Sequence, residues 1–463
     1  MAEKRRGRET AVLVSLNVAC WGATAWLARD LRPQAIRLTD WSIFFALATS
    51  YASAWWGVAV WSRVPRRDTA VRAIATTLVG VVLLLLLELP ALFGLLDYAR
   101  ILSAATGEWS GPATSFVTDA ELVYRRPPHV SWSGRPRSDM AVAWNLPIRA
   151  PAQQSFTTDA RGFRNRRELD EDDVALVGDS FVEGAYVSDD ETVAAGLERL
   201  TGLRVANLGQ SGYGTLQELK VIEKVALPLQ PRMLVWFFFE GNDLYDDQTY
   251  ENALAHLRAH GTLTTTGHRW TLAWRGFRYA SFTNTAFRLL RRIADPLVPN
   301  AVSSVGWFDA ADARVQRLYF YPDAALRWGD FERERFEKTK AAFLRGRELC
   351  AAHGIRLLVV FIPTKFRVYA DFCRFPPGSP CLSWHPWRLP EEFAQFCRER
   401  GIASFDLTDA MRQAAASGKL LYVPEDSHWS VEGHRFVAKL LADEWRRVPQ
   451  GAAVADTLAR EIE

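Results

Sequence analysis

The chain has 463 residues, of which 49% are hydrophobic and 24% are charged, a balance that suits a globular protein with some membrane-embedded sequence. Its formal net charge of +3 is small for this length, and no Lys/Arg run is interleaved with aromatic residues, which argues against a nucleic-acid-binding protein. No spacing of Cys and His indicates a metal site. We therefore expect neither a metal nor another cofactor.

Apolar residues dominate the first hundred positions. Three runs there approach the ~20 residues that a helix needs to cross a bilayer, so we expect transmembrane helices at about 11–28, 41–61 and 73–96. Because two runs follow the first, a retained anchor over residues 1–97 is favoured over a cleaved signal peptide. The third run contains Glu88, for which a functional role and an interfacial position are both open.

Basic residues flank these runs unequally. Four precede the first run and four lie between the second and third, whereas three occupy the first loop. Cytoplasmic loops carry an excess of Lys and Arg, so we expect a cytoplasmic N-terminus. The sequence thus predicts a multi-pass inner-membrane protein whose remaining residues are periplasmic or extracellular.

After the anchor, residues 98–173 predict a connector and an irregular leading lobe. From 174 to 449, short β-branched or aromatic runs alternate with amphipathic stretches, which predicts an α/β fold with a doubly wound, mostly parallel sheet. Residues 245–330 break this rhythm and are expected to be an insertion at the carboxyl edge, where lids commonly lie; residues 450–463 form a C-terminal tail. The expected strands are 174–177, 204–206, 233–239, 355–362 and 402–405, and the expected helices are 191–200, 216–226, 331–353, 390–400 and 431–445.

Four polar blocks follow the expected strands. Gly178-Asp179-Ser180 comes directly after the first strand, so Ser180 lies at a strand-to-helix turn that suits a nucleophile. Asn207–Gly212 follows the second strand, Gly241–Asp243 follows the third, and Asp426–Trp429 precedes the last helix. Because binding sites in open α/β sheets lie at the carboxyl ends of the strands, we expect these blocks to converge.

As a set, the four blocks resemble the SGNH (GDSL-like) hydrolase family, whose blocks supply a Ser, a Gly, an Asn and a His. The resemblance covers roughly 174–445 outside the insertion. It implies that Ser180 is the nucleophile and His428 its base. It also implies an oxyanion hole made by the backbone N–H groups of Ser180 and Gly212 and by the side-chain amide of Asn242.

Asp426 is favoured as the acid that orients the base, while Glu425, at the commoner family spacing, stays open. His434 is expected to have a role on the face of the last helix. The Asp-x-His-Trp arrangement is also similar to that of alginate-type O-acetyltransferases, although their Asp-His pair precedes the serine. Polysaccharide-acetylating relatives have Pro-x-Lys segments like the one at Lys365, which implies a substrate-binding lysine; a solvated loop lysine is the alternative.

Cysteine usage gives one further expectation. Cys373 and Cys381 bracket a short stretch rich in Pro and Gly, which predicts a disulfide-closed loop in an oxidising compartment.

The resemblance implies an extracytoplasmic serine O-acyltransferase or esterase. Its expected substrate is an O-acyl group, above all O-acetyl, on a glycan, and its expected intermediate is acyl-Ser180. A separate membrane acyltransferase is the expected acyl donor. Two alternatives remain: a carboxylesterase or lipase of the same fold, and a catalytically silent glycan-binding scaffold.

Overall fold

The computed structural model divides into two compact units, which are described separately: a helical unit within 1–106, 142–147 and 267–303, and an α/β unit within 107–141, 148–266 and 304–463. The tail expected at 450–463 and the end of the first apolar run lie outside the described residues. The described residues are 8, 10–12, 14–23, 36–61, 65–105, 116–136, 138–140, 153–261, 277, 280–294, 304–322 and 324–447.

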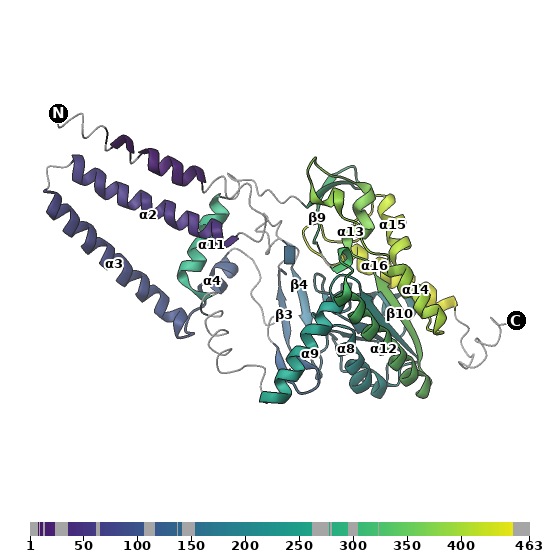
Figure 1. Ribbon diagram of the computed structural model, residues 1–463. Coiled ribbons are helices and arrows are strands. Elements are labelled where there is room, and N and C mark those ends of the chain that lie inside the picture. Colours follow the sequence, from purple (N-terminus) through teal and green to yellow (C-terminus); the bar gives the residue numbers. More distant parts are fainter. Residues whose placement is uncertain are drawn as a thin grey trace. The chain divides into compact units, whose positions relative to one another are not determined.

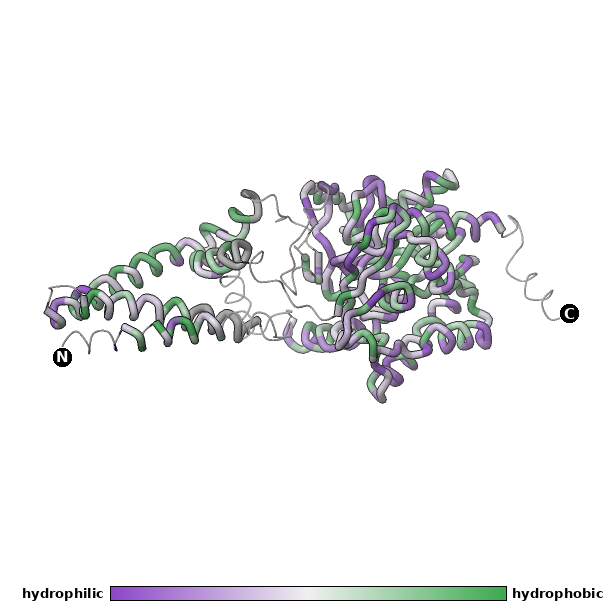
Figure 2. Tube along the Cα trace, turned by 90° about the horizontal axis from the view of Figure 1, so that it is seen from above, coloured by the Kyte–Doolittle hydropathy of each residue, from purple (hydrophilic) through white to green (hydrophobic). Residues whose placement is uncertain are grey.

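The helical unit contains α2 (Ile36–Trp61), α3 (Arg66–Leu92), α4 (Tyr98–Ala105) and α11 (Phe282–Ala294), as Figure 1 shows. Within the described residues, Arg67–Leu92 is the helix that is long and apolar enough to cross a membrane, and none of its most apolar stretch is buried. Figure 2 shows these long helices mainly in green and white, with purple where the chain turns from α2 into α3.

The prediction of three transmembrane helices is therefore not supported. The described helix of the first run, Thr10–Ala23, is apolar but short. The helix of the second run carries polar side chains, and some of them contact the first run. The Asn17 amide donates to the Ser53 hydroxyl (2.6 Å), and the Ser50 hydroxyl donates to the Asn17 carbonyl oxygen (2.9 Å). The indole N–H of Trp21 donates to the same Ser50 hydroxyl (3.0 Å).

Glu88 in α3 has a structural partner in the predicted insertion. Its carboxylate accepts the backbone N–H groups of Phe282 (3.1 Å) and Thr283 (2.7 Å), the first two residues of α11. The rings of Tyr98 and Phe282 pack edge to face, 5.5 Å apart. Glu88 thus satisfies donors at the start of α11 that have no partner within the helix, and this part of the insertion belongs to the helical unit.

The α/β unit is built on a five-stranded parallel sheet in the order β12-β10-β7-β5-β6. Numbered along the chain, this is the order 2-1-3-4-5 of one class of doubly wound folds, so the predicted fold class is confirmed for this unit. The strands are β5 (Val174–Gly178), β6 (Val205–Gly209), β7 (Met233–Phe239), β10 (Arg356–Ile362) and β12 (Ser404–Asp406).

Each face of the sheet has its own core because side chains alternate along every strand. In β7, Val235 and Phe237 enter one core cluster, whereas Leu234, Trp236 and Phe238 enter the other. The first cluster is covered by α7 (Val193–Thr201), α15 (Thr408–Ala416) and α16 (Val431–Arg447), and the second by α8 (Thr215–Val221), α12 (Asp330–Ala352) and α14 (Leu389–Glu399).

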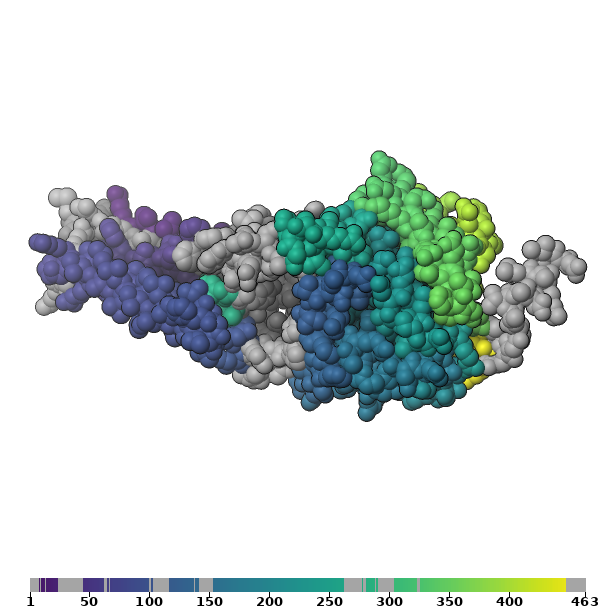
Figure 3. Space-filling model, turned by 90° about the horizontal axis from the view of Figure 1, so that it is seen from below, coloured from purple at the N-terminus to yellow at the C-terminus, as the bar shows by residue number. Residues whose placement is uncertain are grey.

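The leading lobe has regular structure that the sequence analysis did not predict. It contains two antiparallel strand pairs, and Figure 3 shows its blue surface beside the teal surface of α9. The Tyr250 hydroxyl of α9 donates to the backbone carbonyl of Glu121 in this lobe (2.9 Å). The strands of these pairs are β1 (Val117–Asp119), β2 (Val123–Arg125), β3 (Ser131–Gly134) and β4 (Gln154–Thr157).

The rest of the described insertion also packs on the α/β unit. Helix α9 (Asp243–His260) contacts α8 and α12. Strands β8 (Val305–Asp309) and β9 (Val315–Tyr319) form a hairpin that is extended by β11 (Cys373–Arg374). The insertion is thus divided between the two units, and its described residues do not form a single lid.

Candidate active site

The carboxyl ends of β5, β6 and β7 bring three of the sequence blocks together. Gly178 at the end of β5 pairs with Gly209 at the end of β6, and β7 lies on the other side of β5. The chain order reverses between β5 and β7, which is where doubly wound sheets bind ligands. Ser180 begins the short helix α6 (Ser180–Glu183) after β5, and Asn242 immediately precedes α9 after β7.

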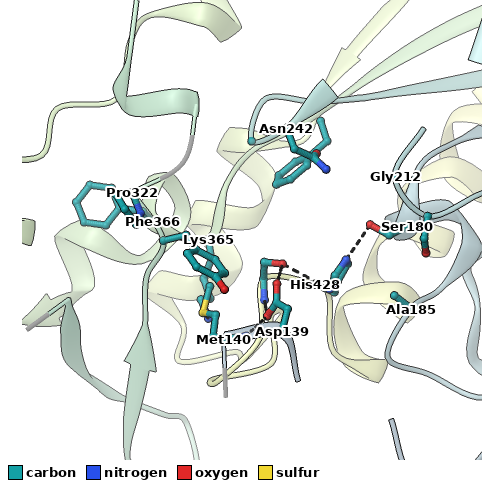
Figure 4. Close-up of a pocket in the computed structure, with 15 residues that line it drawn as sticks. Asp139, Met140, Ser180, Ala185, Gly212, Asn242, Pro322, Lys365, Phe366 and His428 are labelled. Atoms are coloured by element: carbon teal, nitrogen blue, oxygen red, sulfur yellow. Dashed lines mark hydrogen bonds between the residues drawn. The ribbon is translucent and has the colours of Figure 1, made fainter. Parts of the chain in front are cut away.

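Ser180, His428 and Asp426 form a continuous hydrogen-bonded series. His428 Nε2 lies 2.8 Å from Ser180 Oγ, and His428 Nδ1 lies 2.6 Å from Asp426 Oδ1. The backbone N–H of His428 also donates to Asp426 Oδ1 (2.9 Å). Figure 4 shows the Ser180–His428 contact at one side of the pocket. The carboxylate beside the ring is therefore that of Asp426 and not that of Glu425.

The charges around His428 fix the protonation of the series. Burial alone would lower the pKa of His428, but the charge and hydrogen bond of Asp426, with further charge from Asp139 and Asp179, raise it to about 9. Burial alone would raise the pKa of Asp426, but His428 lowers it to about 2. An ionised Asp426 accepts Nδ1–H, so the Nε2 of neutral His428 is left to accept the Ser180 hydroxyl.

His434 is buried beside Trp429, the residue that follows His428. It is 1% exposed in α16, and its ring packs edge to face against Trp429, 5.6 Å away. Burial lowers the pKa of His434 to about 3, so it stays neutral. It does not contact Ser180, which agrees with the helix role expected for it.

The oxyanion-hole groups expected from the sequence face the same volume. In the described part of the chain, neither the Ser180 N–H nor the Gly212 N–H donates to another protein group. Gly212 has a φ of 78°, and a Cβ there would lie 2.8 Å from the Tyr124 hydroxyl, so a larger residue would be strained. Asn242 donates one amide hydrogen to Asp246 (2.7 Å), which leaves its second N–H for a substrate.

Glu183, three residues after Ser180, ties α6 to its surroundings. Its carboxylate accepts Nε (2.9 Å) and an Nη (3.1 Å) of Arg126 from the leading lobe, and the amide of Gln210 (3.0 Å). It also accepts the Ser211 hydroxyl. Burial alone would raise the pKa of Glu183, but Arg126 holds it below its ordinary value. One buried carboxylate therefore fixes both the nucleophile helix and the loop that carries Gly212.

A cavity of about 440 Å³ opens beside Ser180 and His428. Figure 4 shows Asn242 and Gly212 on one side of it and Pro322, Lys365 and Phe366 on another. The cavity is lined by Asp139, Met140, Ser180, Ala185, Ser211, Gly212, Phe239, Gly241, Asn242, Tyr321, Pro322, Lys365, Phe366, Ser427 and His428.

Lys365 begins α13 (Lys365–Tyr369) at the cavity wall and is 3% exposed. Its ammonium donates to the backbone carbonyls of Val423 (3.1 Å), Pro424 (2.9 Å) and Asp426 (2.7 Å). An ammonium has three hydrogens to donate, so in this structure Lys365 holds the loop that carries Asp426. Its predicted contact with substrate stays a prediction.

The predicted disulfide is not formed: Cys373 and Cys381 are both free thiols. Cys373 pairs with Phe308 of β8, and its side chain packs over Gly306 of the same strand. Burial raises the pKa of Cys373 to about 12 and that of Cys381 to about 11.

The sequence analysis did not identify three residues of the site. Asp246 had a usable signal, since it follows Asn242 by four residues and so lies on the same side of a helix. Glu183 is adjacent to the serine block, but its buried partner Arg126 is remote in sequence. Asp139, which contacts the Asp426 loop, lies in the leading lobe and carries no local signal.

Comparison with known families gives one match. A family model described as "SGNH hydrolase-like domain, acetyltransferase AlgX" matches residues 319–460. The matched region contains Lys365, Asp426 and His428, whereas Ser180 lies before it.

Curated proteins similar to this chain are described as probable alginate O-acetylase AlgJ. The one from Azotobacter vinelandii is 30% identical over 122 residues, which are 24% of this chain and 30% of that protein. The one from Pseudomonas putida is 30% identical over 112 residues, 24% of this chain and 28% of that protein. The chain thus spans less than a third of the length of these relatives.

The solved structures that a structural comparison found include a putative lipolytic protein of the G-D-S-L family from Desulfitobacterium hafniense, with a TM-score of 0.31 and 12% identity over 58% of this chain and 97% of that one. Another is Axe2, an acetylxylan esterase from Geobacillus stearothermophilus, with a TM-score of 0.30 and 12% identity over 60% of this chain and 94% of that one.

Proposed function

We propose that this chain is an SGNH-type esterase or O-acetyltransferase that moves O-acyl groups, above all acetyl, on a glycan outside the cytoplasm. The match to an SGNH hydrolase-like family model and the likeness to probable alginate O-acetylases support this proposal. The observation that carries the proposal is the 2.8 Å contact between Ser180 Oγ and His428 Nε2, with the Asp426 carboxylate behind the ring. A serine so paired is poised for acyl transfer.

In the first half-reaction, Ser180 Oγ attacks the carbonyl carbon of an acyl ester while His428 Nε2 takes the hydroxyl proton. The oxyanion that forms accepts the N–H groups of Ser180 and Gly212 and the amide of Asn242. When the intermediate collapses, the ester C–O bond breaks and His428 gives its proton to the leaving alcohol. The acyl group remains on Ser180.

In the second half-reaction, an acceptor hydroxyl attacks the acyl-Ser180 carbonyl. His428 takes the acceptor's proton and then returns it to Ser180 Oγ as the acyl–serine bond breaks. A sugar hydroxyl as acceptor gives an O-acylated glycan, and water gives a free acid. The same residues therefore serve transfer and hydrolysis.

A glycan acceptor is supported by the relatives, which are described as probable alginate O-acetylases. The cavity of about 440 Å³ falls within the usual range for small-ligand sites, and its wall includes the aromatic side chains of Phe239, Tyr321 and Phe366. We assign the acyl group to the Ser180 end of this cavity and the acceptor sugar to the aromatic wall.

For location, we propose that α3 anchors the chain in a membrane. The support is its length, its apolar composition and the absence of buried residues in its most apolar stretch. Arg66, Arg67 and Arg72 at its beginning favour a cytoplasmic position for that end, which puts the α/β unit on the far side. An acyl donor there would come from a separate membrane acyltransferase.

The test begins with a fluorophosphonate probe on the full chain in detergent. Wild type should be labelled and Ser180→Ala should not, whereas Ser417→Ala, which removes an exposed serine remote from the site, should be labelled like wild type. Absence of labelling on folded wild type would contradict the enzyme mechanism.

The acceptor is tested separately. Wild type should release p-nitrophenol from p-nitrophenyl acetate, and added oligosaccharide should become acetylated, as mass spectrometry would show. Release of acetate without any acetylated sugar would restrict the activity to hydrolysis. A preference for long acyl chains would instead favour a lipase.

A further inference from the structure

The loop that carries Asp426 and His428 is held by a second carboxyl group from the leading lobe. The backbone N–H of Asp139 donates to Asp426 Oδ2 (2.7 Å). In return, the backbone N–H of Ser427 donates to Asp139 Oδ1 (3.0 Å), and the Ser427 hydroxyl donates to Asp139 Oδ2. The Ser138 hydroxyl donates to the backbone carbonyl of Glu425.

These bonds use both oxygens of both carboxyl groups. Asp426 Oδ1 accepts from the backbone and ring of His428, and Asp426 Oδ2 accepts from Asp139. Because Asp426 is bonded on both sides, its carboxylate cannot rotate away from the imidazole without losing a bond. Asp139 also holds Ser427, which lies between the two residues of the pair in sequence.

We infer that Asp139 is a positioning residue that fixes the Asp426–His428 pair for acyl transfer to and from Ser180. The inference rests on the proposed function. It assigns part of the reaction geometry to the leading lobe, outside the four sequence blocks. Asp139 and Met140 of this lobe line the cavity.

Charge gives the inference a measurable consequence. A carboxylate oxygen of Asp139, a carboxylate oxygen of Asp426 and a ring nitrogen of His428 all lie within 4.8 Å of one another. Burial and the charge of Asp426 raise the pKa of Asp139 to about 6, so Asp139 is ionised at the alkaline pH where His428 loses its proton. Among the described residues, other titratable groups that interact with this cluster are Asp179, Lys365, Glu425, Tyr186, Tyr321 and His434.

The deciding variant is Asp139→Asn in the full chain. It keeps the backbone N–H and the side-chain size, but it removes the charge and places a donor opposite the Ser427 hydroxyl. We expect kcat/KM for p-nitrophenyl acetate to fall about tenfold, as for a lost hydrogen bond to a charged group. We also expect the acid limb of the kcat/KM profile to move about one pH unit lower, because the imidazolium loses a nearby negative charge.

Two variants serve as controls. Asp139→Glu keeps the charge, so the acid limb of its kcat/KM profile should stay at the wild-type pH while kcat/KM itself falls. Asp330→Asn changes a fully exposed carboxylate at the start of α12 and should behave as wild type in both respects.

The outcomes separate the inference from the function. If wild type is neither labelled by fluorophosphonate nor active, the proposed function fails. If wild type is active but Asp139→Asn has the wild-type kcat/KM and the wild-type position of the acid limb of its pH profile, the inference is overturned. A fall that is equal at every pH, with a lower melting temperature, would make Asp139 merely structural and would also overturn it. If Asp139→Asn does not fold, Ser427→Ala decides, and unchanged kcat/KM in that variant overturns the inference.

Discussion

Asn242 divides its amide between the protein and the proposed oxyanion. One N–H is held by Asp246 at 2.7 Å, and the other is the part that would meet developing charge. Removing this donor should affect the transition state more than the bound substrate, because the charge on the carbonyl oxygen develops only during reaction.

Asn242→Ala should therefore lower kcat for p-nitrophenyl acetate about 10²–10³-fold with little change in KM. Steady-state kinetics of purified full chain would measure this. Asn252→Ala, an exposed amide on the same helix α9, is the matched control and should retain wild-type kcat. A wild-type kcat in Asn242→Ala would exclude the amide from the oxyanion hole.

The pH profile depends on His428. Its pKa is raised to about 9, because the charges of Asp426, Asp139 and Asp179 outweigh the effect of burial, and only the neutral imidazole can accept the serine proton. The protonated, inactive form therefore predominates below this pKa, and kcat/KM should rise with pH until about pH 9. A plateau already reached near pH 7 would show that these charges do not act on the base.

At the scale of the elements, α6 and the Gly212 loop are joined to the leading lobe by the Arg126–Glu183 pair. Both side chains are nearly fully buried, at 8% and 2% exposure. Breaking such a pair leaves one buried charge without compensation, whereas replacing both partners by apolar residues is much less costly.

Glu183→Ala should therefore destabilise the α/β unit by about 3–5 kcal/mol. The double variant Arg126→Leu/Glu183→Ala should recover a large part of that loss. Urea unfolding of the full chain in detergent, monitored through the loss of esterase activity, would give the free energy of unfolding of both variants. If the double variant is no more stable than Glu183→Ala, the cost does not arise from the unpaired arginine.

The central elements could be predicted because their signals are local. The run Met233–Phe239 is apolar throughout, as a strand buried on both faces requires, and the structure begins and ends β7 at those residues. The four sequence blocks were placed correctly because each follows directly on a strand end or precedes a helix. Asp426, rather than Glu425, was favoured as the acid, and it is the residue bonded to the ring.

What the sequence did not indicate depends on contacts between distant residues. Asp139 reaches a loop almost three hundred positions away, and nothing in its neighbours marks it. The pairing of β11 with β8, which places Cys373 beside Phe308, also joins segments that are remote in sequence. Lys365 could be placed at the site edge from its position after β10, but its bonds to the loop at Val423 could not.

At the scale of the whole molecule, the chain builds each unit from separated segments. The helical unit takes residues from before the α/β unit and, inside it, from 142–147 and 267–303. Within the helical unit, Glu88 binds the start of α11 and Tyr98 packs on Phe282. The helical unit and the insertion therefore depend on each other for stability.

A truncation pair tests this dependence. Removing residues 1–106 alone should give aggregated protein, because α11 loses Glu88, its acceptor, and the helices α3 and α4 against which it packs. Removing 1–106 and also replacing 267–303 by a flexible Gly/Ser linker of equal length should give more soluble protein that still hydrolyses p-nitrophenyl acetate. Size-exclusion chromatography and esterase assays would compare the two, with Ser180→Ala in the second as the background. Equal solubility and activity in both truncations would show that α11 is stable without residues 1–106. The helical unit would then not fold cooperatively, contrary to what its contacts indicate.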